Sequence, residues 1–296
     1  TENAWRQAEK AGTPVVFFIN HLDHHNSNFD ETVKQLRDYF GEKVTLTQYP
    51  VKTGEGFDSI IDLMLMKMLR FKQGGGAPEV LDIPAAEMEK AERLHRSLIE
   101  NAAEGEESLM EKYFEEDNLD LSEVRRGIQM GMISRGVFPV FCGASKHGIG
   151  VHRLMDFIVF TCPAPNCLPG CALTNGKVVK CSVANPASLF IFKLANEQHL
   201  GEVSLIKAYG GEITEGQDLI NPRSGNKERI SQLMIVNGKN REKIEKVVAG
   251  DIAVTIKLKD ARANDSLMDP KAADAGFEPI AYPDPIFTTA VKAVSA

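Results

Sequence analysis

Two short, continuously apolar segments place the strongest constraint on the fold. They are Val15–Ile19 (VVFFI) and Val137–Cys142 (VFPVFC), and both are rich in β-branched and aromatic residues. Such runs are typical of parallel strands that are buried on both faces. Each is followed by a loop and then by an amphipathic helical pattern, at Asp30–Phe40 and Val151–Phe160. The repeated order of strand, loop and helix predicts an α/β fold with a parallel sheet.

The stretch between these two segments combines strand-like and helical patterns. Its first half contains strand-like pieces, among which the alternating Met and Leu residues of Ile60–Leu69 fit both the strand and the helix period. We interpret this stretch as a strand. From Pro84 the pattern is helical, and Asp120 followed by Glu123 resembles a capping box, which marks the start of a helix.

The C-terminal half has a different character. Pro163, Pro165 and Pro169 mark a linker, and from Phe190 to Leu267 short strands alternate with turns, as in a small antiparallel β-barrel. We therefore expect an α/β part at residues 1–165, the barrel at 166–275 and the start of a further domain at 276–296. The chain opens on a helical pattern at residues 1–11, so we expect a fragment of a longer protein.

Composition and charge narrow the function classes. With 43% hydrophobic and 25% charged residues, the chain matches a soluble globular protein, and no apolar run is long enough to cross a membrane. Five cysteines, an odd number, favour a reducing compartment, so we expect a cytoplasmic protein. The net charge of −7 lacks the excess of basic residues typical of nucleic-acid binders.

The charge is unevenly distributed. Residues 85–125 contain 13 acidic and 5 basic residues, a net of −8, which leaves +1 for the rest of the chain. Conversely, Arg223–Lys246 contains seven basic and three acidic residues, a net of +4 that could meet an RNA backbone. Ordinary solvation of a hairpin explains the same stretch equally well.

The first loop that carries chemistry is Asn20, His21, Leu22 and Asp23, directly after the strand Val15–Ile19. It resembles the Asn-Lys-x-Asp loop of guanine-nucleotide proteins, with His21 in place of Lys. There, the carboxylate accepts hydrogen bonds from two nitrogens of guanine, which adenine cannot reciprocate. A plain surface loop is the alternative for so short a motif.

The second loop, Gly143, Ala144, Ser145 and Lys146, follows the other buried strand. Its expected role is to direct backbone N–H groups and a small side chain at the guanine oxygen. Glycine at such a turn also serves packing alone in many α/β folds. Two loops in equivalent positions carry more information than either one.

Four long segments resemble bacterial elongation factor G, and the resemblance runs through all 296 residues. They are TENAWRQAEKAGTPVVFFINHLD, IPAAEMEKAERLHRSLIENAAEGEESLMEKYF, FPVFCGASKHGIGV and GNKERISQLMIVNGKNREKIEKVVAGDIAV. The resemblance implies the second part of a P-loop-GTPase-like domain without its N-terminal half, an inserted α+β subdomain with helices at about Val44 to Gly136, and the translation-factor barrel called domain II.

The resemblance also implies a function. The full-length protein would bind GTP or GDP with Mg²⁺, associate with ribosomal RNA and stalk proteins, and promote translocation or ribosome recycling. The nucleotide contacts would come from the two loops, that is, from Asn20, His21, Asp23, Ala144, Ser145 and Lys146. The chain itself contains no G-x-x-x-x-G-K-[ST] phosphate loop, so we expect it alone to be monomeric, without hydrolytic activity and without tight nucleotide binding.

Two departures from the family pattern leave alternatives to an ordinary GTP-hydrolysing elongation factor open. His21 replaces Lys, and Ala144-Ser145 inverts the usual Ser-Ala order before Lys146, which stands in place of an aromatic residue. A paralogue that binds ribosomes without hydrolysing GTP and a ribosomal-protection factor both remain open. A metal site built from His21, Asp23 and the neighbouring histidines is disfavoured, because consecutive loop residues rarely converge on one ion.

Overall fold

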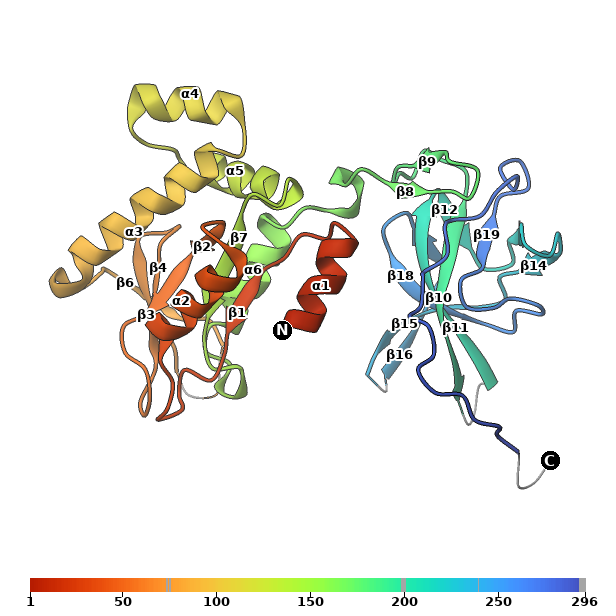
Figure 1. Ribbon diagram of the computed structural model, residues 1–296, viewed down its shortest axis with the longest axis horizontal. Coiled ribbons are helices and arrows are strands. Elements are labelled where there is room, and N and C mark those ends of the chain that lie inside the picture. The colour runs from red at the N-terminus through yellow and green to blue at the C-terminus, as the bar shows by residue number, and fades with distance from the viewer. Residues whose placement is uncertain (73, 75, 198–200, 239, 293–296) are drawn as a thin grey trace. The chain divides into compact units, whose positions relative to one another are not determined.

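The computed structural model describes residues 1–72, 74, 76–197, 201–238 and 240–292 (Figure 1). They form two compact units, divided after Pro163. The first unit is built on a parallel sheet with the strand order β1-β7-β2, in which Phe17–Ile19 is β1, Phe138–Cys142 is β7 and Val44–Leu46 is β2. The two apolar segments are therefore neighbouring parallel strands, as predicted.

Two helices follow these strands where the sequence predicted them, α2 at Phe29–Phe40 and α6 at Val151–Phe160. Asn28 caps the start of α2, because its side chain accepts a hydrogen bond of 3.1 Å from the N–H of Glu31. Such a cap satisfies one of the unpaired N–H groups of a helix start. Strand–loop–helix order is thereby confirmed at both places.

The N-terminal helix α1 (Glu2–Lys10) has no fully buried residue and is attached through one aromatic side chain. The Trp5 ring lies 4.4 Å from the ring of Phe40 and 4.9 Å from that of Phe138, measured between centroids. The guanidinium of Arg135 covers Trp5 at 5.2 Å and donates to the carbonyls of Ala8 and Thr13. Aromatic contact and hydrogen bonds thus compensate for the polar sequence of this helix.

The insertion contains a separate antiparallel sheet with the order β3-β4-β5-β6. Its strands are Gln48–Pro50 (β3), Ser59–Asp62 (β4), Lys67–Arg70 (β5) and Glu79–Leu81 (β6). Because β2 pairs with β7, residues 44–46 belong to the parallel sheet.

The prediction of one strand over Ile60–Leu69 was wrong, because the chain turns back in the middle. The Asp62 carboxylate accepts from the N–H groups of Met64 and Leu65, both at 3.0 Å, and Met66 adopts a positive φ of 49°. Ile60 consequently pairs with Leu69 across a hairpin. The turn is set by one aspartate inside an apolar run, so it left no glycine or proline signal in the sequence.

Three helices complete the insertion: α3 at Ala85–Ala103, α4 at Glu107–Glu116 and α5 at Leu121–Ile133. The capping box at the start of α5 is confirmed, since Asp120 and Glu123 each accept from the other's backbone N–H. Helices α3 and α5 approach closely at Gly127, where a Cβ atom would lie 2.1 Å from the carbonyl oxygen of Ala102. Only glycine permits that approach.

The second unit is an antiparallel barrel-like sheet with the order β14-β13-β19-β10-β11-β18-β15-β16 (Figure 1). The strands of this sheet are β10 (Ser188–Glu197), β11 (Gly201–Gly210), β13 (Asp218–Ile220), β14 (Lys227–Arg229), β15 (Leu233–Asn237), β16 (Asn240–Ile244), β18 (Ile252–Ile256) and β19 (Ser266–Met268). Two smaller pairs join β8 (Cys171–Ala172) with β9 (Val178–Val179) and β12 (Glu212–Thr214) with β17 (Lys246–Val248). The core includes Leu189, Ile206 and Leu267, which are fully buried.

Residues 279–291, within the segment expected to begin a further domain, contain no strand. Just before it, Phe277 is buried against the barrel beside Tyr209 and Phe190. In the described part of the chain, none of the helices has the length and apolar character that a membrane crossing requires.

Candidate functional site

The two loops singled out in the sequence lie side by side, because they leave the carboxyl ends of paired parallel strands. Ile19 at the end of β1 is in register with Cys142 at the end of β7. The N–H of Gly143 donates to Ile19 O at 3.0 Å, and the N–H of Leu22 donates to Gly143 O at 3.2 Å. In open α/β sheets, ligands bind at this edge.

Asn20 and Ser145 connect the loops through two further hydrogen bonds. The Asn20 amide donates to Ser145 Oγ at 2.8 Å, and its carbonyl oxygen accepts from the Ser145 N–H at 2.9 Å. Both ends of one amide side chain are therefore used on one serine. The first and second loops form a single unit, in which Asn20 has a positioning role.

Asp23 holds the carboxylate at this site. Its Oδ2 lies 3.3 Å from Nε2 of His147, while its Oδ1 is buried without a hydrogen-bond partner among the described residues. A buried carboxylate oxygen without a donor is costly, so a donor from a ligand or water is expected there. The acceptor pair fits a ligand that offers two adjacent N–H groups.

Asp23 and His147 open into a cavity of about 380 Å³. It is lined by Asp23, His24, His25, Glu55, Gly56, Phe57, His147 and Ile149. Glu55, Gly56 and Phe57 belong to the turn before β4. The N–H of Gly54 donates to Leu22 O at 2.8 Å and so joins this turn to the first loop. The volume suits a bicyclic base.

The other predicted contact residues are placed differently. His21 is exposed and adopts a positive φ of 62°, whereas Ala144 is 1% exposed. The Ala144 N–H already donates to Ile149 O at 3.0 Å. Since the Ser145 N–H is also bonded, to Asn20, Lys146 is the residue of the second loop whose N–H has no partner among the described residues.

Glycine is required at the base of the second loop. A Cβ atom on Gly143 would lie 2.2 Å from Ile149 O and 2.9 Å from the ring of Phe18. Gly150 has a φ of 80°, and a Cβ there would lie 2.3 Å from Cys142 O. The loop can therefore cross the strand end only with these two glycines.

A buried ion pair joins α6, the helix after the second loop, to strand β4 of the insertion. Arg153 on α6 places Nε 2.7 Å from Oδ2 of Asp62, and the two side chains are 7% and 1% exposed. The Gln48 amide donates to the same oxygen at 3.0 Å. This network ties the helix that follows the second loop to the sheet of the insertion.

Sequence reasoning missed His147, Glu55 and Phe57 as parts of this site. His147 had no nameable partner in the sequence, because Asp23 lies 124 positions earlier. The signal that could have found it is its place in the turn after the second loop, the short 3₁₀ helix Ser145–His147. Among the described residues, no group of three or more His, Cys, Asp or Glu side chains is arranged to hold a metal ion.

The basic stretch Arg223–Lys246 of the barrel carries little unpaired charge. Each of its basic residues in the described part forms an ion pair with a carboxylate of the barrel. The pairs are Arg223 with Asp265 and Asp260, Lys227 and Arg229 with Asp218, Arg241 with Glu197, Lys243 with Glu215, and Lys246 with Glu212. Lys239 lies outside the described residues. The net of +4 therefore does not form a free basic surface.

Family comparisons agree with this geometry. The model described as elongation factor Tu GTP binding domain matches residues 1–164, which is more than half of the chain. The chain belongs to the translational GTPase family. The model described as elongation factor G domain 2 matches residues 186–270, which form the barrel. The match to bacterial elongation factor G itself is thus shown for the family and not for the individual factor.

A solved structure provides a second comparison. A protein from Thermus thermophilus superimposes with a TM-score of 0.78 at 22% sequence identity, covering 96% of this chain and 41% of that one. At this identity the likeness supports the fold alone. The chain spans less than half the length of the solved protein it matches. The comparisons thereby confirm the predicted fold class, a GTP-binding domain followed by an antiparallel barrel.

Proposed function

We propose that this chain is part of an elongation-factor-G-like translation factor that binds guanine nucleotide and the ribosome and promotes translocation or ribosome recycling. The observation that carries the nucleotide part is the Asp23 carboxylate, whose buried Oδ1 has no partner among the described residues. Guanine offers a ring N–H and an exocyclic amine side by side, so it matches this acceptor pair. His21 would lie beside the base, and Lys146 would supply a backbone N–H.

The proposed site recognises the base and supplies little for the phosphates. The 296 residues contain no glycine-rich phosphate loop, and phosphoryl transfer depends almost entirely on positioning and charge stabilisation around the phosphates. We therefore expect GDP to bind this chain alone more weakly than micromolar. A longer protein that contains this chain and a phosphate loop is the form in which the nucleotide, with Mg²⁺, would be held.

The test is a change of base specificity in such a longer protein. Asp23→Asn replaces an acceptor oxygen by an amide donor, so the affinity for GDP should fall about 100-fold, which corresponds to one or two charge-assisted hydrogen bonds. Xanthosine diphosphate, which carries a carbonyl where guanine has the amine, should bind the variant better than GDP. Asp30→Asn, an equal charge change on the exposed start of α2, is the matched control. Equal GDP affinity of the wild type and Asp23→Asn would refute the proposal.

One observation favours a variant of this function in which GTP hydrolysis matters less. Three of the four N–H groups of the second loop are used internally, by Ile19, Ile149 and Asn20, and His21 stands where the family has lysine. Both features should lower the affinity of the protein for the nucleotide. GTP turnover of the full-length protein with ribosomes tests this, and a rate equal to that of an ordinary elongation factor would contradict it.

The two parts of the chain would meet different ribosomal partners. The insertion, with its net of −8 over residues 85–125, would face the stalk proteins, as the resemblance to elongation factor G implies. Co-sedimentation of the chain with ribosomes, with and without stalk proteins, measures this contribution. An association unaffected by loss of the stalk would contradict that assignment.

A further inference from the structure

We infer that the base site accepts the diphosphates of inosine and guanosine alike, because His147 takes the place of the exocyclic amine of guanine beside Asp23. His147 is thereby a residue that determines specificity. The inference rests on the proposed function and deepens it. Guanine nucleotide remains a ligand, but the site selects the ring N–H and the neighbouring carbonyl that guanine shares with hypoxanthine, the base of inosine.

The two oxygens of the Asp23 carboxylate have different surroundings. Oδ2 lies 3.3 Å from Nε2 of His147, whereas Oδ1 is buried and has no hydrogen-bond partner within the described chain. An ionised carboxylate can only accept hydrogen bonds, so the imidazole nitrogen that faces it acts as an N–H donor. The protein therefore supplies one oxygen with a donor, and the other needs a donor from a ligand or water.

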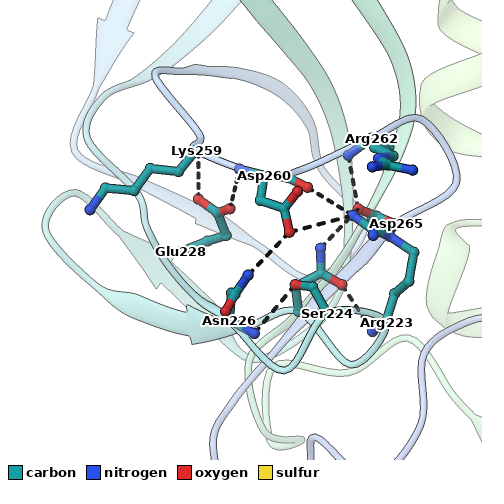
Figure 2. A network of polar contacts seen from close by, with 9 residues as sticks. Arg223, Ser224, Asn226, Glu228, Lys259, Asp260, Arg262 and Asp265 are labelled. Atoms are coloured by element: carbon teal, nitrogen blue, oxygen red, sulfur yellow. Dashed lines mark hydrogen bonds and ion pairs between the residues drawn. The ribbon is translucent and has the colours of Figure 1, made fainter.

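The open acceptor at Asp23 is an exception in this chain. Both oxygens of Asp62 accept hydrogen bonds from neighbouring groups. The same is true of Glu228 and Asp265 in the barrel, whose network is drawn in Figure 2. Of the carboxylate oxygens buried in the part of the chain that the structure describes, Oδ1 of Asp23 alone has no partner. The fold otherwise satisfies its buried carboxylates, so this oxygen marks a position for a donor from a ligand.

Lys146 supplies the complementary group. It lies directly before His147 in the 3₁₀ helix Ser145–His147, and its backbone N–H has no partner among the described residues. The site therefore offers one free acceptor and one free donor. In guanine and hypoxanthine a ring N–H stands next to a carbonyl oxygen, which matches this pair. Adenine presents a ring acceptor next to an amine, the reverse arrangement, and should be rejected.

The exocyclic amine of guanine adds little in this geometry. It adjoins the ring N–H and would be directed at Oδ2 of Asp23, where it has to share the oxygen with His147. Glu55, the other carboxylate at the cavity, is exposed, and a hydrogen bond that competes with water yields little net affinity. Hypoxanthine, which lacks the amine, should consequently bind almost as well as guanine. Without His147, Oδ2 would be free for the amine, and guanine would be preferred.

The experiment compares the equilibrium affinities of GDP, IDP and ADP for the longer protein that contains this chain and a phosphate loop. Because the three ligands carry the same ribose diphosphate, the ratios of their affinities report on the base alone. For the wild type we expect GDP and IDP to bind within about threefold of each other, and both to bind at least about tenfold more tightly than ADP, which cannot make the hydrogen bond to the charged carboxylate.

The variants of His147 test its role. In His147→Ala the ratio of GDP to IDP affinity should rise to about tenfold or more, because the amine gains a charged acceptor. His147→Gln keeps a side-chain N–H at a similar reach and should restore the ratio of the wild type, which a merely structural role of His147 does not predict. The matched control is His152→Ala, which removes an exposed histidine that pairs with Asp156 on α6 and should leave the ratio unchanged. Circular dichroism checks that the variants keep their fold.

Two results would overturn the inference: a wild-type preference for GDP over IDP of more than about threefold, or a ratio that His147→Ala leaves unaltered. In either case a clear preference for GDP over ADP leaves the proposed binding of guanine nucleotide standing. If GDP and ADP bind equally, or if neither binds, the proposed function fails and the inference fails with it.

Discussion

Arg153→Met removes one partner of the buried ion pair beneath the candidate nucleotide site. The remaining Asp62 carboxylate would stay buried at 1% exposure without its positive charge, and such losses cost about 3–5 kcal/mol. Here the lower end applies, because Asp62 keeps three donors, the Gln48 amide and the N–H groups of Met64 and Leu65. We expect a loss of about 3 kcal/mol from the first unit.

Urea unfolding followed by tryptophan fluorescence measures this loss. Trp5 is the single tryptophan of the chain, and it packs on Phe17, Phe40 and Phe138, so its emission reports on the first unit alone. With a slope of about 2 kcal/mol per molar urea, the midpoint should fall by about 1.5 M.

Two comparisons isolate the cause. Arg70→Met removes an arginine from an exposed pair with Glu79, at 3.9 Å, and should shift the midpoint by less than about 0.3 M. The double variant Arg153→Met with Asp62→Asn removes both buried charges and should recover part of the loss. If Arg153→Met and Arg70→Met behave alike, the buried pair does not support the site as argued.

Three further predictions concern the loops and the barrel. Asn20→Ala breaks both hydrogen bonds to Ser145 and should lower the urea stability of the first unit by about 1–2 kcal/mol; an unchanged midpoint would show that the loops are held together otherwise. Gly143→Ala places a Cβ 2.2 Å from a backbone oxygen and should cost about 3 kcal/mol, whereas Gly136→Ala, whose nearest neighbour is a side chain at 3.3 Å, should cost less than about 1 kcal/mol. Burial opposes ionisation of Asp265, but the hydrogen bonds from Arg223 and Asn221 prevail and lower its pKa. The ionised carboxylate therefore stabilises the barrel above its unfolded pKa of about 3.9, and this stabilisation is lost as the pH falls through the lower folded pKa. Asp265→Asn should flatten the acid part of the curve of barrel stability against pH, measured by circular dichroism. Parallel curves for wild type and variant would contradict this.

The parts of the fold that could be predicted are those whose signal is local. The continuous apolar runs that became β1 and β7, the apolar face of α6 and the capping box at Asp120 each have a cause within a few residues. The reversal at Met64 and Leu65 could not be predicted, because one aspartate turns the chain inside an apolar run. Local patterns carry no information on which backbone groups a side chain will reach.

For the candidate site, the sequence indicated the two loops but not which of their side chains and backbone groups contact one another. That Asn20 and Ser145 come together follows from parallel pairing of the two strands, which the pattern of apolar runs predicted. The proximity of His147 to Asp23 depends on the tight turn that Gly143 permits, and no local pattern in the sequence indicates it. The same holds for the hydrogen bond from the Ala144 N–H to Ile149 O, which removes a donor that the motif predicts for a ligand.

Counting charges along the sequence predicts a charged surface for the insertion, but it fails for the basic stretch of the barrel. Ion pairing explains the difference. In the insertion, the 13 acidic residues between 85 and 125 face 5 basic ones, so most carboxylates cannot be paired locally, and Lys112 already serves both Glu116 and Glu123. In the barrel, the fold brings carboxylates such as Glu215 and Glu212 within ion-pair distance of Lys243 and Lys246. A local excess of charge therefore becomes a charged surface only where the fold brings no opposite charge within reach. By this criterion the described cations of Arg223–Lys246 form no free basic surface, because each of them is ion-paired with a carboxylate of the barrel.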